Sequence, residues 1–277
     1  MNIYQIYYND KTFKLLDKSF IPLENSNKLG KEWFEFNAIF QFLSNNKLEE
    51  DTWYGFLSPE FYNKTKLSGI ELKQHLSLNR KSNVCLASSC FDQIAIYQNS
   101  FIQGDTKHPG LIKTTNYLLK KYDMNLPLNE LIGHSHNTVF SNYVIAKKKY
   151  WETWYDLAKL FVKLEKNDKK FSDLVNNKGK YKNTEVKLGV FIQERFPNIL
   201  LSSYNYNVTT ILSPYYEPCN KLLSTDYWVK GLLQTCDHLK VRYAKTGKKE
   251  LIPLIKSILA EINLFINDQN RKSINIL

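Results

Sequence analysis

The most constraining feature of this sequence is the stretch of residues 138–165, TVFSNYVIAKKKYWETWYDLAKLFVKLE. It contains a short run of β-forming residues, Tyr143, Val144 and Ile145, which leads into a basic turn at residues 147–149. Beyond the turn, apolar residues recur with the spacing of a single helix face: Trp151, Trp154, Tyr155, Ala158, Phe161, Val162 and Leu164. The pattern predicts a strand that leads the chain directly into a buried helix.

A second unusual stretch, residues 188–201, reads LGVFIQERFPNILL. It is mostly apolar, yet it carries the adjacent charges Glu194 and Arg195 in its middle. Charges in a buried segment are costly unless they are paired or have a function. Two interpretations stay open, a chemical role for Glu194 and a buried structural ion pair.

The rest of the chain alternates strand-like and helix-like segments and ends in helices alone, which is typical of a mixed α/β domain with a helical cap. We expect the sheet domain over residues 1–212 and the cap over 213–277, with a mobile charged insertion at 166–182. The predicted strands are 3–8, 20–24, 53–57 and 84–87; the predicted helices are 33–46 (with Phe34, Ile39, Phe42 and Leu43 inward), 68–75, 114–122, 226–243 and 250–266.

Several short motifs resemble one known family. The spacing N-x-x-x-A-K-x-x-x-W (Asn142, Ala146, Lys147, Trp151), followed by E-R-F (Glu194, Arg195, Phe196), resembles bacterial GT-A-like glycosyltransferases of capsule and lipopolysaccharide gene clusters. The segments YGFLSPEFYNKT (54–65) and QGDTKHPG (103–110) are similar to segments of proteins from the same setting, so that the resemblance spans residues 1–210 in short pieces. It implies a GT-A-like nucleotide-binding mixed sheet flanked by helices, a nucleotide-sugar donor and a glycan or lipid-linked acceptor.

The sequence departs from this family at the position of its metal-binding motif. Metal-dependent GT-A enzymes carry an Asp-x-Asp pair after a small-residue strand, because hard cations take oxygen ligands. Here Asn83 and Ser88–Ser89 stand in that region, and the nearby acid is Asp92. No cofactor is therefore certain, and Mn²⁺ or Mg²⁺ stays open; a metal-independent site would need Lys, Arg or His to offset the charge of the leaving diphosphate.

Two carboxylates are candidates for the catalytic base. Asp105 lies in a polar segment, residues 99–111, which we expect to be a loop punctuated by Gly104, Gly110 and Pro109. In the same segment Gln103, Lys107 and His108 could bind the donor, although a plain surface connection stays possible. Glu194 is the second candidate, because the resemblance places this residue near the acceptor sugar.

Other candidate binding residues follow predicted strands or lie in polar loops. Ligands of α/β sheets bind beyond the carboxyl ends of strands, where the sequence places Tyr7, Asn9, Asp10 and Ser58. The remaining candidates are Lys64 for a diphosphate, Asn142 and Arg195 from the family motif, and His134 and His136 for a diphosphate or a metal. Each has a structural alternative: turn residues for Asn9 and Asp10, solvated charge for Lys64, and incidental histidines.

Charge and hydropathy limit the partners and the location. Residues 1–140 carry 15 Lys and Arg against 14 Asp and Glu, whereas residues 141–277 carry 23 against 13. A basic second half suits an anionic membrane surface around a lipid-linked acceptor; a nucleic acid is less favoured, because no binding motif is present. Without an apolar run of about 18 residues or a signal peptide, we expect a cytoplasmic protein, peripheral at the inner face of the membrane at most.

The sequence leaves a second class of function open. A degenerate GT-A-like fold without its metal motif could be a non-catalytic binding or scaffold protein of polysaccharide assembly. The cysteines Cys85, Cys90, Cys219 and Cys236 have neither zinc-like nor C-x-x-C spacing, and we expect reduced thiols.

Overall fold

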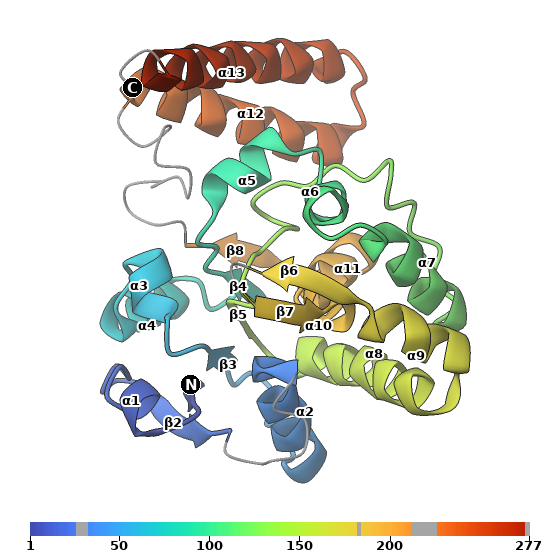
Figure 1. Ribbon diagram of the computed structural model, residues 1–277. Coiled ribbons are helices and arrows are strands. Elements are labelled where there is room, and N and C mark those ends of the chain that lie inside the picture. Colours follow the sequence, from blue (N-terminus) through green and yellow to red (C-terminus); the bar gives the residue numbers. More distant parts are fainter. Residues whose placement is uncertain (26–32, 182–183, 212–225, 275–277) are drawn as a thin grey trace.

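Six strands form one mixed sheet in the order β2–β1–β3–β5–β4–β8 in the computed structural model (Figure 1). The model describes residues 1–25, 33–181, 184–211 and 226–274. The strands of this sheet are β1 Asn2–Tyr7, β2 Ile21–Glu24, β3 Tyr54–Leu57, β4 Val84–Leu86, β5 Val144–Ala146 and β8 Val208–Thr210. The four predicted strands and the predicted strand before the aromatic helix are thus confirmed.

One strand runs against the others. β5 pairs antiparallel with β3 and β4, whereas β1–β2, β1–β3 and β4–β8 are parallel pairs. The amino end of β5 therefore lies at the same edge of the sheet as the carboxyl ends of the parallel strands. Polar residues that precede β5 and polar residues that follow β3 meet at this edge.

Helices flank the sheet and a separate helix pair covers one end (Figure 1). An antiparallel hairpin, β6 Lys178–Tyr181 with β7 Thr184–Lys187, precedes α10. The helices are α1 Asp10–Phe13, α2 Glu35–Asn45, α3 Phe61–Thr65, α4 Gly69–Leu78, α5 Phe91–Ile96, α6 Ser100–Lys107, α7 Leu111–Lys121, α8 Lys148–Asn167, α9 Lys169–Asn176, α10 Leu188–Gln193, α11 Phe196–Ser203, α12 Tyr227–Thr246 and α13 Leu251–Ile274.

The aromatic helix α8 is the centre of the core, as its pattern predicts. Trp151 is 2% exposed and its indole N–H donates to the carbonyl oxygens of Tyr54 (3.0 Å) and Ala146 (3.2 Å). One side chain thus satisfies backbone groups of both β3 and β5, which a purely apolar residue could not do. Trp154 and Phe161 continue the same buried face.

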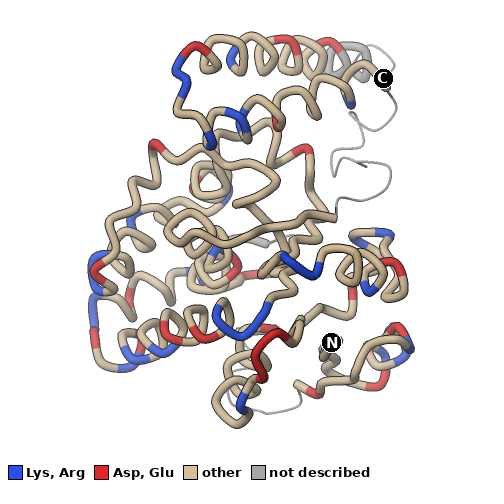
Figure 2. Tube along the Cα trace, turned by 180° about the vertical axis from the view of Figure 1, so that it is seen from behind, with Lys and Arg blue, Asp and Glu red and all other residues tan. Residues whose placement is uncertain are grey.

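Two lysines of the basic turn at residues 147–149 pair with acidic residues of a neighbouring turn. Lys147 pairs with Asp51 at 3.1 Å, and Lys148 pairs with Glu50. Figure 2 shows this acidic turn beside the basic turn. The turn therefore contributes less free positive charge to the surface than the sequence count suggests.

The predicted loop at residues 99–111 is wrong, because most of it is helix α6. Asn99 caps this helix, and its Oδ1 accepts from the N–H groups of Phe101 and Ile102, both at 2.9 Å. Gly104 inside the helix is explained by packing: a Cβ there would lie 2.5 Å from an Nη of Arg195. The glycine allows a guanidinium to approach the helix and does not mark a turn.

Two further details differ from the prediction. The segment expected to be a mobile charged insertion contains regular structure at residues 169–181, where α9 and β6 form, and Phe171 and Val175 of α9 are buried in the core. Helix α2 begins at Glu35, so that Phe36 takes the inward position, whereas Phe34 is 41% exposed at the N-cap. Residue 182 of the insertion lies outside the described residues.

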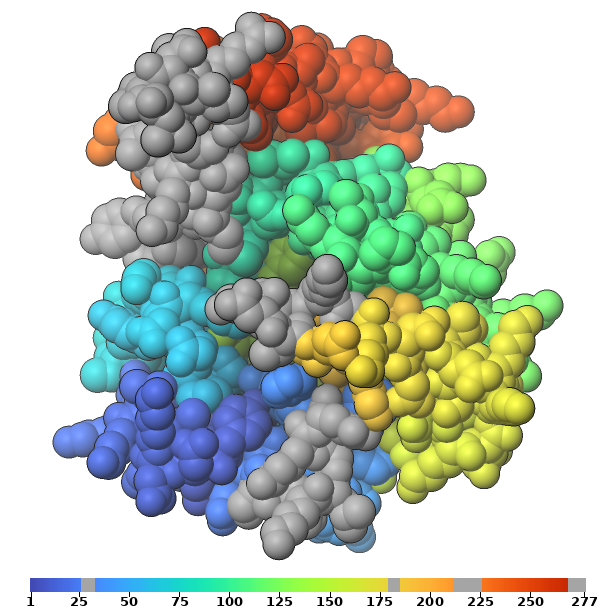
Figure 3. Space-filling model, viewed as in Figure 1, coloured from blue at the N-terminus to red at the C-terminus, as the bar shows by residue number. Residues whose placement is uncertain are grey.

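The C-terminal helix pair α12 and α13 is confirmed and forms its own layer above α5 (Figures 1 and 3). Its contact with α5 has a small hydrophobic cluster separate from the main core: Phe91, Ala95, Val229, Leu233 and Ile262. The predicted domain boundary at 212/213 and Cys219 fall outside the described residues. Among the helices that the structure describes, none is long and apolar enough to cross a membrane.

Candidate functional site

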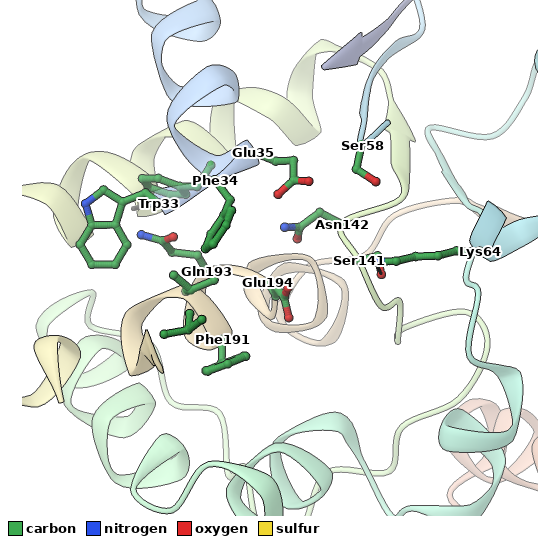
Figure 4. Close-up of a pocket in the computed structure, with 13 residues that line it drawn as sticks. Trp33, Phe34, Glu35, Ser58, Lys64, Ser141, Asn142, Phe191, Gln193 and Glu194 are labelled. Carbon is green, nitrogen blue, oxygen red and sulfur yellow. Dashed lines mark hydrogen bonds between the residues drawn. The ribbon is translucent and has the colours of Figure 1, made fainter. Parts of the chain in front are cut away.

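A cavity of about 160 Å³ opens at the edge where β3 ends and β5 begins (Figure 4). Ser58 follows β3, and Ser141 and Asn142 precede β5, so that the chain reversal of β5 brings these polar residues to one place. Helices α2, α3 and α10 with its flanking residues supply the other walls. The remaining lining residues are Trp33, Phe34, Glu35, Phe36, Lys64, Val186, Val190, Phe191, Gln193 and Glu194.

The backbone around the cavity is held in uncommon conformations. Ser141 and Asn142 are consecutive residues with φ of 61° and 56°, and Phe34 across the cavity has φ of 47°. Non-glycine residues with positive φ are uncommon and are often found at functional sites. Hydrogen bonds fix the surroundings: Ser58 Oγ lies 2.8 Å from the hydroxyl of Tyr143, and Lys64 Nζ donates to Ser141 Oγ at 3.2 Å.

Two amide side chains of the cavity wall have polar atoms without partners. Gln193 is 2% exposed, and both its Nε2 and its Oε1 lack a hydrogen-bond partner among the described residues. The buried Oδ1 of Asn142 also lacks one. Leaving such atoms unpaired costs about 1–3 kcal/mol each, and buried polar groups in folded proteins are nearly always paired. These amides therefore place unpaired polar atoms at the wall of the cavity.

Two carboxylates face the same space as these amides. Figure 4 shows Glu35 at the start of α2 and Glu194 at the end of α10, with Asn142 between them. Burial raises the pKa of Glu194, Arg195 lowers it, Glu35 raises it and Lys64 lowers it, with a net increase. A half-buried carboxyl group with a raised pKa is a stronger base than a solvated one, which suits it for proton abstraction from a hydroxyl.

No local pattern selects Glu35 or Gln193 as a site residue: Glu35 lies among aromatic residues, and Gln193 lies in an apolar run. In the structure, Glu35 also acts on Tyr8, whose phenol pKa is raised first by burial and then by this carboxylate. Their role in the site depends on contacts between segments more than 150 residues apart, for which no local pattern exists.

Arg195 belongs to the scaffold. Its Nε donates to the carbonyl oxygen of Ser100 (2.9 Å) and its two Nη atoms donate to the carbonyl oxygen of Phe191 (2.7 Å) and to Gln103 Oε1 (3.0 Å). Burial lowers its pKa to about 10, with Glu194 opposing the shift. The guanidinium therefore ties α6 to α10, and Gln103 serves as its acceptor at this junction.

Asp105 and His108, two predicted site residues at the end of α6, also have structural positions. Asp105 Oδ1 accepts from the N–H groups of Gly110 (3.1 Å) and Ile112 (2.9 Å), which caps the start of α7. His108 stacks on Phe191 at 3.5 Å between ring centroids, and burial, Arg195 and Lys107 lower its pKa to about 4. Lys107 is exposed. Asp105, Lys107 and His108 do not line the cavity.

His134 and His136 lie at the junction with α12. His134 Nδ1 accepts from the N–H of His136 at 3.1 Å, and burial, followed by nearby positive charge, lowers its pKa to about 3. Ser135 between them donates to Asp237 of α12 through its N–H (2.8 Å) and its hydroxyl (2.6 Å). The structure therefore does not bring these histidines to the cavity.

The candidates after β1 lie apart from the cavity as well. Asn9 caps α1 in a capping box with Thr12, and Asp10 is an exposed residue of its first turn. Tyr7 packs against Phe13 with 5.0 Å between ring centroids. Of the predicted site residues, the structure brings Ser58, Lys64, Asn142 and Glu194 together around one cavity.

The donor set of the described residues does not favour a metal centre. No group of three His, Cys, Asp or Glu side chains that could hold a metal ion occurs within the described ranges. At the end of β4, Ser88 Oγ instead accepts from the N–H of Phe140 at 3.3 Å.

Comparisons with protein-family models, curated proteins and solved structures find no match for this chain. The family resemblance thus stays a prediction, and a function has to be argued from the cavity.

Proposed function

We propose that this protein is a glycosyltransferase that moves a sugar from a nucleotide sugar to a glycan or lipid-linked acceptor of surface-polysaccharide assembly. The observation that carries the proposal is the base Glu194 beside the unpartnered amides of Gln193 and Asn142 in one cavity. Such a set of acceptors and donors is suited to a ligand with many hydroxyl groups. Its place, beyond the carboxyl ends of strands, is where α/β sheets bind their ligands.

The two ends of the cavity differ in a way that fits the two substrates. Lys64 lies at one end and Trp33 at the other, with the two carboxylates between them (Figure 4). A lysine ammonium is a point charge suited to a phosphate group, and an aromatic ring offers an apolar face to a sugar. Trp33 can approach α10 closely because residue 189 is glycine: a Cβ there would lie 2.7 Å from the indole ring.

In the proposed reaction, the carboxylate of Glu194 takes the proton of the acceptor hydroxyl. The acceptor oxygen forms a bond to C1 of the donor sugar as the bond from C1 to the diphosphate oxygen breaks. Lys64 offsets the negative charge that develops on the departing nucleoside diphosphate. A mixed sheet flanked by helices is also the architecture that the resemblance to GT-A-like enzymes implies.

Replacing the proposed base tests the reaction directly. Glu194→Gln keeps the size and removes the basicity, and we expect sugar transfer to fall about 10²–10⁴-fold. The assay follows release of UDP, GDP or CMP from their sugar nucleotides in the presence of neutral glycan acceptors. The melting temperature of the variant should stay close to that of the wild type.

Asp105→Asn is the matched control, because its side chain still offers an oxygen to the start of α7. Transfer by this variant should equal that of the wild type. Equal loss in both variants, or full activity of Glu194→Gln, would contradict the proposal. Binding of nucleotide sugars without any transfer by the wild type would favour the non-catalytic alternative.

A further inference from the structure

Negative charge is concentrated in the middle of the cavity, where Asn142 lies between the carboxylates of Glu35 and Glu194 (Figure 4). The charged groups that shift the pKa of the Glu194 carboxyl are the adjacent Arg195, Glu35 from α2 and Lys64 from α3. Arg195 uses its guanidinium in three hydrogen bonds to Ser100, Phe191 and Gln103. Lys64 lies at the end of the cavity away from Trp33, and its Nζ donates a hydrogen bond to Ser141 Oγ (Figure 4).

Among the described residues, Lys187 is a further cation close to Trp33. Its Nζ is 5.2 Å from the centroid of the Trp33 ring, and Lys187 is not one of the cavity-lining residues. The polar groups that the described residues present to a ligand between Trp33 and Asn142 are two carboxylates and two amides, beside aromatic rings. A sugar hydroxyl can donate to a carboxylate, whereas a second carboxylate would be repelled by it.

We propose that Glu35 determines the acceptor: its carboxylate accepts a hydrogen bond from a second hydroxyl of an uncharged sugar and excludes sugars that carry a carboxylate there. This inference rests on the proposed function, because it assigns the part of the cavity between Trp33 and Asn142, which the two carboxylates face, to the acceptor. Glu194 takes the proton of the reacting hydroxyl, and Glu35 holds a neighbouring hydroxyl of the same ring. The amides of Gln193 and Asn142 are placed to bind the remaining polar atoms of that sugar.

Glu35 also affects the reaction through Glu194. Its negative charge adds to burial in raising the pKa of Glu194. A base with a raised pKa is ionised only at higher pH, so that the acid limb of the pH profile lies at higher pH than for a solvated glutamate. Removal of the Glu35 charge should move this limb to lower pH.

Binding of matched sugars tests the specificity. The probes are methyl β-D-glucopyranoside and methyl β-D-galactopyranoside, each paired with its uronide, and binding is measured by saturation-transfer NMR on the wild-type chain, Glu35→Gln and Glu152→Gln. Glu152 is an exposed residue of α8 and serves as the control for loss of one negative charge. We expect the wild type and Glu152→Gln to prefer a neutral sugar over its uronide by about tenfold or more, since the uronide carboxylate would meet the like charge of Glu35.

In Glu35→Gln this preference should fall several-fold, and Glu35→Asp, which keeps the charge, should retain it. An unchanged preference in Glu35→Gln, or absence of binding of all four sugars to the wild type, would overturn the inference. The second readout is the pH profile of transfer, in which the acid limb of Glu35→Gln should lie at lower pH. A purely structural role of Glu35 would change the amount of folded protein and leave both readouts unmoved.

The two proposals can fail separately. If the wild type binds neutral sugars and discriminates through Glu35 but transfers nothing, the assignment of Glu35 as a sugar-binding residue stands and the proposed reaction is wrong. If transfer depends on Glu194 and the neutral-to-acidic ratio does not depend on Glu35, the reaction stands and the inference about specificity is wrong.

Discussion

Two buried polar regions of this protein differ in how completely their groups are paired. At the junction of α5 and α12, Lys240 is 1% exposed and donates to the carbonyl oxygens of Ile94 (2.9 Å), Ala95 (2.7 Å) and Tyr97 (2.6 Å). Asp237 accepts twice from Ser135 in the same region. In the cavity, by contrast, both amide atoms of Gln193 are unpaired among the described residues.

A charged group in a paired network stabilises the fold, because each member satisfies another. The polar junction therefore holds α12 to the sheet domain. An unpaired buried group costs stability, and among the described residues such atoms also occur away from the cavity, in His108, Tyr150 and Ser202, so that a missing partner alone does not mark a ligand site. Gln193 and Asn142 combine unpaired atoms with a place on the cavity wall, and for this reason we propose the cavity at the β3–β5 edge as the site of function.

The largest expected effect on stability comes from breaking the junction. Lys240→Met removes the ammonium that caps the last carbonyls of α5, and we expect the free energy of unfolding to fall by about 2–4 kcal/mol. Burial lowers the pKa of Lys240 to about 8, so that it still carries its proton at pH 7. Urea unfolding at pH 7 measures the change.

Lys245→Met is the control for this prediction, since Lys245 is an exposed residue of the same helix. It should change the free energy of unfolding by no more than about 0.5 kcal/mol. Sugar binding per folded molecule should be the same in both variants. A loss in Lys240→Met no larger than that of the control would show that the junction contributes little.

A smaller effect is expected from the pH dependence of the same junction. The folded-state pKa of His134 is about 3, below its ordinary value of 6.5. As the pH falls below 6.5, this histidine therefore binds a proton in the unfolded chain while it stays neutral in the folded chain. The contribution of His134 to the free energy of unfolding is therefore fully present above about pH 6.5. It is lost as the pH falls below this value, by at most about 1.4 kcal/mol per pH unit for one group. His108, with a pKa of about 4, adds a second contribution of the same sign.

His134→Asn should remove the first of these contributions, because an amide oxygen can still accept from the N–H of His136 without taking up a proton. Urea unfolding of both proteins at pH 7, 6 and 5 should show a shallower decline for the variant. Parallel declines would mean that His134 is protonated in the folded protein.

The sequence predicted the elements whose signals are local. The helix that contains Trp151 and the C-terminal pair have long apolar periodicities. The predicted helix at 68–75 begins with a capping box of Ser68 and Glu71, which is also a local signal. The segment 99–111 was misread because Gly104 resembles a turn residue, whereas its hydrogen side chain makes room for Arg195.

Only part of the cavity could be predicted in the same way. Ser58, Lys64, Asn142 and Glu194 carry motif or strand-end signals, and the structure brings them together. Asp105 has an equally polar setting in the sequence and lies at a helix cap instead. Polarity in a sequence marks both ligand sites and structural junctions, and which polar residues line a cavity is known only once the fold is known.

The most direct test of this account replaces the unpaired amide itself. Gln193→Leu has similar volume and removes the two unpaired atoms, and the free energy of unfolding should stay within about 1 kcal/mol of the wild type or rise. Thermal shift with UDP, GDP and CMP sugars and neutral methyl glycosides, each well above its Kd, should raise the melting temperature of the wild type and not of the variant. Equal shifts in both proteins, or no shift of the wild type with any of these ligands, would contradict the claim that the cavity is the functional site.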